Sequence, residues 1–477
     1  MTTTMDLTIH PRWRRHVATF LGGQTVSLFG SMLVQYAVFW YVAITFQSGV
    51  MMMLTIVLGF LPQAVVSIFA GVWADRMSRK RMIIAADATI ALSTLALALV
   101  LVAGITDTWV IFATLAIRSA GAGVQTPAVS ALIPQITPAA HLMRVNGILS
   151  SLQSALALLG PPVAAGLYAV ASAASGGTVL ALLPIFAIDV VTAAIGIGLL
   201  ATIPVGAVRG AGPAAGYFDD LVEGVRYVAT HPFVRWLLIV YAIVFLLTVA
   251  PADLTPVMLV RSFPSGDQGD VVNLALLEMA FSVGMVAGGV IVATLAARWN
   301  RIALIAGASL VFGALAIALG LAPTLWVFLA VMLLIGLVVP FFSTPSMTLI
   351  QETVEPERQG RVFGFLGIVM AVAAPIGMLV FGPLADVVPI ESILVGSGIA
   401  TFVVIGLALG LPAGRRAIEA ANAASSAAMA APATPPPGAV APVGPVMSPG
   451  SVAPHGPPMS PGPVAPAGPV EPDAPPP

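Results

Sequence analysis

The sequence contains no cysteine, which excludes disulfide bonds and thiolate metal sites. Its five histidines are scattered, and no two of them have the spacing of a metal-binding pair. We therefore expect neither a metal site nor a bound cofactor. Because no nucleophile, metal or phosphate-binding constellation is present, the sequence gives no indication of an enzyme.

Charged residues are also rare. Only 8% of the residues are Asp, Glu, Lys or Arg, whereas soluble domains carry about 25%. Hydrophobic residues make up 58% of the chain, and the mean hydropathy is +1.02. Most of the surface must therefore face an apolar medium. The first apolar stretch, residues 17–46, is too long for the apolar core of a signal peptide, so we expect it to span a membrane.

The apolar stretches predict an all-α membrane protein. A bilayer core about 30 Å thick requires about 20 apolar residues per helix. Helices are expected because a spanning backbone must satisfy its own hydrogen bonds. Twelve stretches are long enough, at about 17–45, 50–74, 82–104, 108–131, 144–171, 178–204, 235–261, 272–297, 302–321, 324–350, 361–385 and 390–412.

The basic residues predict the orientation of these helices. If the N-terminus is cytoplasmic, all 19 Lys and Arg residues except Arg118 and Arg261 fall in cytoplasmic segments. Arg118 would lie within a span and Arg261 on the outer side. Because basic residues concentrate on the cytoplasmic side of membrane proteins, we expect both termini there, in a cell or inner membrane.

The longest connection divides the chain into two halves of six helices. Apolar residues recur at helical spacing between Tyr217 and Val228, which indicates an amphipathic helix on the inner membrane surface. The C-terminal tail is rich in Ala and Pro, a composition typical of disorder. The expected segments are a cytoplasmic N-terminus at 1–16, halves at 17–204 and 235–412, the connection at 205–234 and the tail at 413–477.

The two halves share an internal repeat. In each half, two prolines 11 residues apart are followed by Arg-Val-x-Gly. These stretches lie at 127–147 in the first half and 345–364 in the second. Both halves are expected to start on the same side of the membrane. The sequence therefore predicts two six-helix bundles related by a parallel repeat.

The turn between the second and third spans carries a glycine and a charged cluster, Gly-Val-Trp-Ala-Asp-Arg-Met-Ser-Arg-Lys from residue 71. This turn resembles the signature of major facilitator transporters, although Trp73 and Ser78 stand where Leu and Gly are usual. The resemblance implies a gate that latches the two halves on the cytoplasmic side. The alternative is a basic cytoplasmic loop that has no gating role. Such a loop would explain the arginines, but it would not explain why Gly71 is followed by Asp75 and Arg76 in the order of the signature. The candidate gate residues are Gly71, Asp75, Arg76, Arg79 and Lys80.

Three embedded charges are candidates for coupling transport to protons. Arg118 and Asp189 each lie about 15 Å into their spans, where an isolated charge is unfavourable. We therefore expect them to pair, either structurally or as part of the coupling. The stretch around Arg118 resembles the helix-four motif of proton-coupled drug exporters, but lacks the extra residue before its glycine. Asp253 lies between Pro251 and Pro256, where a kink would expose it to a cavity.

Two other embedded acids are expected nearer the membrane surfaces. Asp87 lies close to the inner end of the third span and is expected to pair with the basic turn. Glu278 lies near the expected outer end of the eighth span and is expected to be hydrated there.

Proline and glycine are expected to bend the fifth and eleventh spans. The bending residues are Gly160 and Pro161 in the fifth span, and Pro375 and Gly377 in the eleventh. Both stretches resemble the antiporter signature of exporters in the same family. Because Pro and Gly are frequent in membrane helices in general, an ordinary structural role is the alternative.

Three stretches, at 23–31, 127–146 and 218–227, are similar to macrolide-efflux-type transporters within the major facilitator superfamily. The general pattern extends over about residues 15–410. The resemblance implies alternating access around a central cavity that is lined partly by the first, fourth, seventh and tenth helices. Siderophore and multidrug exporters share much of the same pattern.

The first span supplies candidate cavity residues. Two glutamines are costly in lipid and should face the interior of the bundle. Aromatic residues of the outer part are further candidates, although an interfacial belt would account for some of them. The candidates are Gln24, Gln35, Tyr36, Phe39 and Trp40.

Together these features predict a proton-coupled exporter of amphipathic, largely apolar small molecules, of the macrolide or multidrug type. Its expected partners are the substrate, protons and the lipid bilayer. We expect a monomer that binds no nucleic acid. One alternative is a siderophore or metabolite exporter of the same fold. Another is a membrane scaffold that recruits partners through the Pro-rich tail, although a scaffold needs neither the repeat nor the gate motif.

Overall fold

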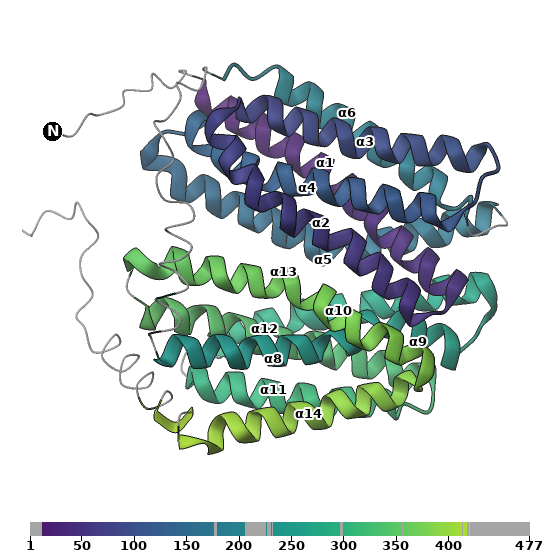
Figure 1. Cartoon of the computed structure of the whole chain (residues 1–477), viewed down its shortest axis with the longest axis vertical. Coiled ribbons are helices and arrows are strands. Elements are labelled where there is room, and N and C mark those ends of the chain that lie inside the picture. Colours follow the sequence, from purple (N-terminus) through teal and green to yellow (C-terminus); the bar gives the residue numbers. More distant parts are fainter. Residues whose placement is uncertain are drawn as a thin grey trace, which may run out of the picture. The chain divides into compact units, whose positions relative to one another are not determined.

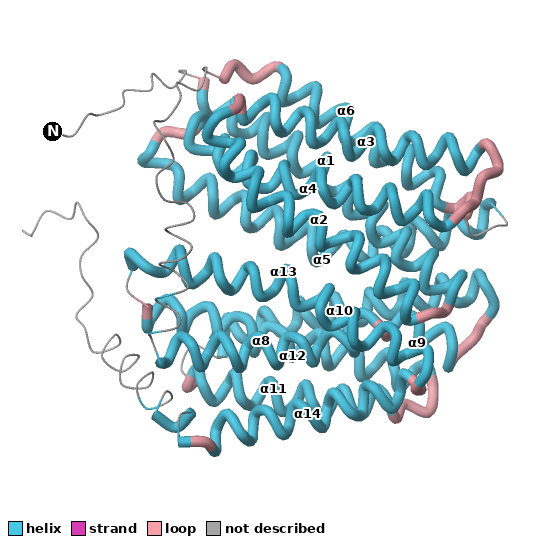
Figure 2. The backbone as a smooth tube through the Cα atoms, in the orientation of Figure 1, coloured by secondary structure: helices cyan, strands magenta, loops and turns pink. Residues whose placement is uncertain are grey.

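The computed structural model describes residues 12–175, 179–205, 226, 230, 232–295, 299–354, 356–412, 414–416 and 419. Every regular element in this part of the chain is helical (Figures 1 and 2). The α-helices are α1 (Trp13–Phe46), α2 (Gly49–Arg76), α3 (Arg79–Val102), α4 (Thr108–Ile136), α5 (Leu142–Ser175), α6 (Leu182–Ala201), α8 (Pro232–Asp253), α9 (Thr255–Ser262), α10 (Gly266–Leu295), α11 (Arg301–Gly320), α12 (Leu325–Thr353), α13 (Pro356–Val387) and α14 (Ile390–Gly410).

These helices form the predicted membrane bundle. Among the described residues, ten spans are long and apolar enough to cross a bilayer, and α8 and α9 together form one of them. The other two predicted spans are α4, which carries Arg118 in its middle, and α13, whose apolar part is Val372–Val387. The predicted fold class, an all-helical protein with multiple spans, is therefore confirmed. Most of the predicted amphipathic helix and almost all of the tail lie outside the described residues.

The seventh span is interrupted in its second half. Helix α8 ends at Asp253 and α9 begins at Thr255, with Leu254 between them. Pro256 lies in the first turn of α9, where its missing N–H donor costs no intrahelical hydrogen bond. The break between α8 and α9 therefore places the Asp253 carboxylate at a helix end in the middle of the bundle.

Both halves repeat one set of helix contacts. In the first half, α1 packs against α5 and α6, while α4 packs against α2 and α3. In the second half, α8 packs against α13 and α14, while α12 packs against α10 and α11. Helix α3 also contacts α6, as α11 contacts α14. The equivalence of these pairs supports the predicted parallel repeat.

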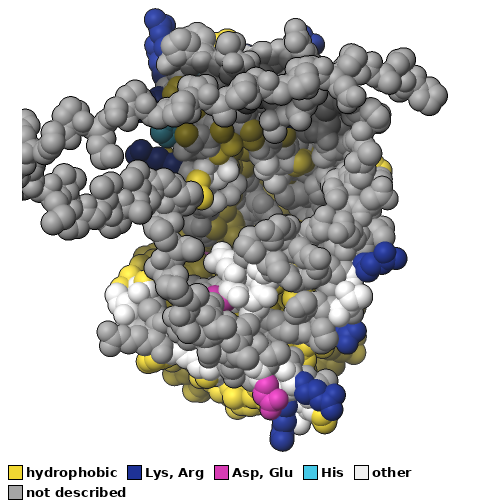
Figure 3. Space-filling model, turned by 90° about the vertical axis from the view of Figure 1, so that its left-hand side faces the viewer, with side chains coloured by type: hydrophobic (Ala, Val, Ile, Leu, Met, Phe, Trp, Pro, Cys, Tyr) yellow, Lys and Arg dark blue, Asp and Glu magenta, His cyan; other side chains and the backbone are white. Residues whose placement is uncertain are grey.

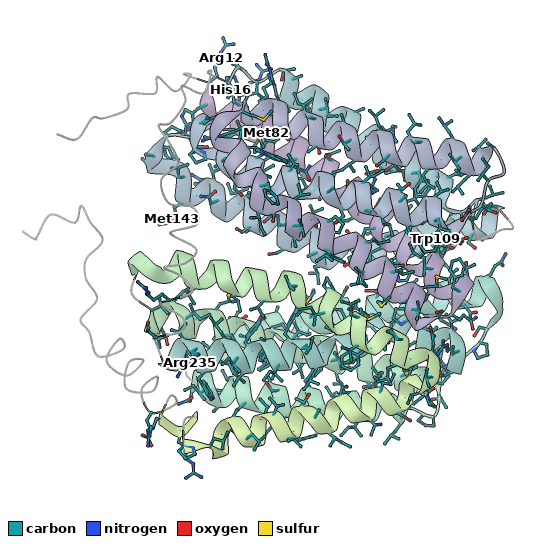
Figure 4. The ribbon with its side chains drawn as sticks, in the orientation of Figure 1. Arg12, His16, Met82, Trp109, Met143 and Arg235 are labelled. Atoms are coloured by element: carbon teal, nitrogen blue, oxygen red, sulfur yellow. The ribbon has the colours of Figure 1, made fainter. Side chains whose placement is uncertain are left out.

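The two halves are joined at one end of the bundle. We call the end at which α1 begins the proximal end and the other the distal end; Arg12, Met143 and Arg235 lie at the proximal end and Trp109 at the distal end (Figure 4). One hydrophobic core lies at the distal end, where it includes Val42 near the end of α1. This core contains residues of both halves. At the proximal end each half has a separate core. The bundle is therefore closed distally.

Glycines set the close approach of α10 and α12. A Cβ atom on Gly284 would overlap with the backbone carbonyl of Leu333, whereas one on Gly289 would meet no atom within 4 Å. We expect Gly284→Ala to lower the stability by about 1–3 kcal/mol, because the backbone of α12 cannot move aside freely. Thermal unfolding in detergent measures this. Gly289→Ala on the same helix is the matched control, and equal melting temperatures for the two variants would contradict the steric argument.

Candidate substrate cavity and coupling groups

A cavity of about 570 Å³ lies between the two halves. Seen from the proximal end, the space between the halves is hollowed, and hydrophobic side chains are visible in the hollow (Figure 3). The wall combines residues of α1, α2 and α5 with residues of α8 to α12. Most of it is aliphatic or aromatic, and the aromatic residues are Tyr36, Phe39, Phe60, Phe245, Phe281, Phe312 and Phe342.

Two carboxylates from the second half face this cavity. Asp253 lies at the end of α8, where the helix break presents it to the cavity, and Glu278 lies on α10. The two acids are within electrostatic range of each other and of the Tyr36 hydroxyl. The described residues of the wall include no Lys, Arg or His. The cavity is thus an apolar chamber with two acidic groups on one side.

The position of Glu278 differs from the sequence-based expectation. The eighth span was expected to begin at residue 272, which would have placed Glu278 near the membrane surface. Helix α10 instead begins at Gly266, so Glu278 lies about 18 Å along its axis. The expected position at the boundary was wrong, and sequence reasoning therefore missed a cavity acid.

The first span supplies three of the five predicted cavity residues. Gln35, Tyr36 and Phe39 line the cavity, whereas Gln24 and Trp40 do not. Gln24 lies about 16 Å from Gln35 along α1 and is buried in the first half. Trp40 is fully buried and stacks on Tyr36, with 5.6 Å between the ring centroids. Trp40 therefore supports the wall from behind.

Arg118 and Asp189 form the expected buried ion pair within the first half. Their side chains are 8% and 0% exposed. Asp189 also accepts hydrogen bonds from the hydroxyls of Thr94 (2.8 Å) and Ser31 (3.1 Å). Arg118 donates a further hydrogen bond to the Ser31 carbonyl (3.3 Å). The pair is enclosed by its own partners and does not belong to the cavity wall.

Among the described side chains, Asp87 pairs with none of the basic turn, contrary to expectation. It accepts hydrogen bonds from Ser27 of α1 (3.2 Å) and from Gln125 of α4. Within the first half, Arg79 donates to the Ala131 carbonyl, and Lys80 donates to the carbonyls of Ala201 and Ile203, at 2.7–3.0 Å. The basic side chains thus hold carbonyls at the proximal ends of α4 and α6.

The described part of the gate motif shows no close helix contact at its glycine. A Cβ atom on Gly71 would meet no atom within 4 Å, so no close helix contact in the described part of the structure depends on this glycine. The side chains of Asp75 and Arg76 lie outside the described part of the structure. The gating role of the turn stays a prediction.

The proline and glycine candidates for helix bends lie within continuous helices. Helix α5 runs through Gly160 and Pro161, and α13 runs through Pro375 and Gly377. Pro161 contributes to the cavity wall. A Cβ atom on Gly377 would lie 2.8 Å from the side chain of Val249, so the glycine lets α13 approach α8 closely.

Comparisons with known proteins agree with this architecture. The family model described as Major Facilitator Superfamily matches residues 20–378 and 265–442. The chain belongs to this superfamily. It is accordingly a multi-pass membrane transporter and not an enzyme.

Two curated relatives of this facilitator are named for macrolide efflux. Macrolide efflux protein A of Streptococcus pyogenes is 31% identical over 385 residues, which cover 78% of the facilitator and 90% of the relative. The protein of that name from Enterococcus faecalis is 32% identical over 325 residues, 67% and 97% of the two chains. A bacterial homologue of the lysosomal transporter Spinster, solved in an inward-facing, unoccupied conformation, has the same fold. Its TM-score is 0.61 at 17% identity, with 88% of the facilitator and 98% of that chain covered.

Proposed function

We propose that this facilitator exports amphipathic, largely apolar small molecules in exchange for protons, by exposing the central cavity to each side of the membrane in turn. The observation that carries the proposal is the cavity itself. Its volume of about 570 Å³ suits a small molecule, and its wall is mainly aliphatic and aromatic. Substrates of repeat-built transporters bind between the repeats. The similarity to macrolide efflux proteins supports efflux as the direction and macrolide-like molecules as the substrates.

The cavity carboxylates narrow the substrate class further. Asp253 and Glu278 have no basic neighbour among the described wall residues. A negative field in an apolar chamber attracts a cation and repels an anion, and the low dielectric strengthens both effects. The site therefore favours neutral or positively charged amphipathic molecules. The same carboxylates are also suited to take up the proton that is exchanged, since each has a charged and a neutral form.

The proposed orientation follows the basic residues. We place the proximal end on the cytoplasmic side, together with the N-terminus, the 205–234 connection and the C-terminal tail. The turn at residues 71–80 is then proposed as the cytoplasmic gate, and the transporter is proposed to act as a monomer. In this orientation the structure is closed toward the outside.

Transport into inside-out vesicles is the test of the proposed function. We expect vesicles that contain the facilitator to accumulate a labelled macrolide when their interior is acidic, because each exported molecule is exchanged for protons. An uncoupler should abolish this accumulation, and vesicles without the facilitator are the control. Uptake that persists with the uncoupler would contradict proton exchange.

The choice of labelled compounds separates the alternatives. Tetraphenylphosphonium and tetraphenylborate have nearly the same shape and opposite charges, so we expect the cation alone to compete with the macrolide. Accumulation of a siderophore in place of the macrolide would instead support a metabolite exporter. A folded protein that transports none of these compounds would favour the scaffold alternative.

A further inference from the structure

The distal closure contains a charged contact between the two halves. Asp386, at the end of α13, accepts hydrogen bonds from the first residues of α2 in the other half. The donors are the backbone N–H of Gly49 (2.7 Å), the backbone N–H of Val50 (3.0 Å) and the hydroxyl of Ser48 (2.8 Å). The N–H groups of a first helical turn have no partner within their own helix. A carboxylate of the second half thus caps a helix of the first half.

Arg261 of α9 completes this contact. Its guanidinium lies 2.9 Å from the Asp386 carboxylate. It also donates to the carbonyl of Ala385 in its own half and to the carbonyl of Gln47 in the first half, each at 2.7 Å. Gln47 ends α1 in a left-handed conformation, with a φ angle of 48°, which turns the chain into α2. The arginine therefore binds the connection between α1 and α2 directly.

Close backbone packing positions these groups. A Cβ atom on Gly49 would overlap with the carbonyl of Gly382, and one on Gly382 would lie 2.6 Å from the Met53 side chain. Helices α2 and α13 therefore approach each other one turn away from Asp386. The halves cannot separate at the distal end without removing the carboxylate from the first turn of α2.

We propose that Asp386 and Arg261 form a distal latch that stabilises the conformation closed at this end and must open once in each transport cycle. Opening leaves the first N–H groups of α2 and the carbonyl of Gln47 without their partners from the other half. Helix α2 then carries a control element at each end. The latch binds the first turn of α2, and the predicted gate turn at residues 71–80 includes the last residues of the helix.

The two latch residues are expected to contribute unequally. Their side chains are 32% and 27% exposed, and an ion pair at such a site adds little by itself. Hydrogen bonds to a charged carboxylate are stronger, and the positive end of the α2 dipole adds to them. Asp386 is therefore the principal residue. For the same reason, exchanging the two residues by Arg261→Asp with Asp386→Arg should not restore the latch, because it places a cation at a helix N-terminus.

The latch can be tested by cysteine labelling, since the chain has no native cysteine. Ala43 in α1 and Val257 in α9 are fully buried in the shared distal core. Single cysteines at these positions react with a maleimide only when the core opens, so the rates report the open population. We expect Asp386→Asn to raise both rates about tenfold, the effect of losing one charge-assisted hydrogen bond.

Glu391→Gln is the matched control. The Glu391 carboxylate lies at the same end and accepts a hydrogen bond from Ser262 (2.6 Å), but both residues belong to the second half. It should leave both labelling rates unchanged. If Asp386→Asn fails to fold, Ser48→Ala removes one of the hydrogen bonds to Asp386, together with the 3.4 Å cap of the Met51 N–H, and should give a smaller increase. Unchanged rates in the folded Asp386 or Ser48 variants would overturn the latch. An increase at Ala43 alone would also overturn it, because local fraying of the α1–α2 turn would then explain the result.

Discussion

Arg118→Ala is expected to destabilise the first half by about 3–5 kcal/mol, because it strands the Asp189 carboxylate in the bundle. Asp189 is fully buried, and its other partners are the hydroxyls of Thr94 and Ser31. Neither hydroxyl supplies a positive charge. The loss should appear as a lower melting temperature in detergent and as less folded protein in the membrane.

A double variant tests whether the stranded charge is the cause. Arg118→Met with Asp189→Asn removes both charges, and the amide oxygen still accepts a hydrogen bond. We expect this pair of changes to recover most of the lost stability, as replacement of buried ion pairs by neutral residues often does. If the double variant is as unstable as Arg118→Ala, the charge is not the cause.

The ion pair of Arg301 and Glu352 in the second half provides the matched control. Its side chains are 20% and 19% exposed, compared with 8% and 0% for Arg118 and Asp189. Arg301→Ala should cost only about 1 kcal/mol, because solvent screens a partly exposed charge. Equal losses from the two arginine variants would show that burial does not set the cost.

The membrane spans and the central ion pair could be predicted from the sequence for a simple physical reason. A bilayer imposes a length and an apolar composition on every span, so hydropathy alone indicates the helices. The same medium makes a charge at the midplane unfavourable, so Arg118 and Asp189, at similar depths in one half, had to neutralise each other. The structure places them in contact.

The cavity could not be predicted as completely, because its wall is apolar like the lipid-facing surface. Phe245, Phe281 and Phe342 line the cavity, whereas the equally apolar Phe402 does not. Only the three-dimensional packing of both halves separates these two kinds of surface. Polarity was also an incomplete guide within α1, since Gln35 lines the cavity while Gln24 is buried in the first half.

Neutralising the cavity acids is expected to abolish coupled export while substrate binding is retained. The described residues of the cavity wall include no Lys, Arg or His beside Asp253 and Glu278, so no cationic side chain of the wall holds either acid in its charged form. Asp189, in contrast, is held by Arg118, Thr94 and Ser31. The proposed proton carriers are therefore Asp253 and Glu278. The buried pair has a structural role in this proposal.

The experiment uses Asp253→Asn with Glu278→Gln in proteoliposomes, with a neutral amphipathic substrate so that lost attraction for a cation does not confuse the result. An amide cannot bind and release the exchanged proton. A pH gradient should then give a substrate concentration ratio of about 1, the value without coupling, because a gradient acts only through a group that binds its ion. Exchange of labelled for unlabelled substrate needs no net proton movement and should continue.

Asp107→Asn, which alters a carboxylate that caps α4 outside the cavity, should leave uphill transport intact. Full uphill transport in the doubly neutralised protein would assign the coupling to another group, and loss of exchange together with uphill transport would show that the two acids are required for more than carrying the proton.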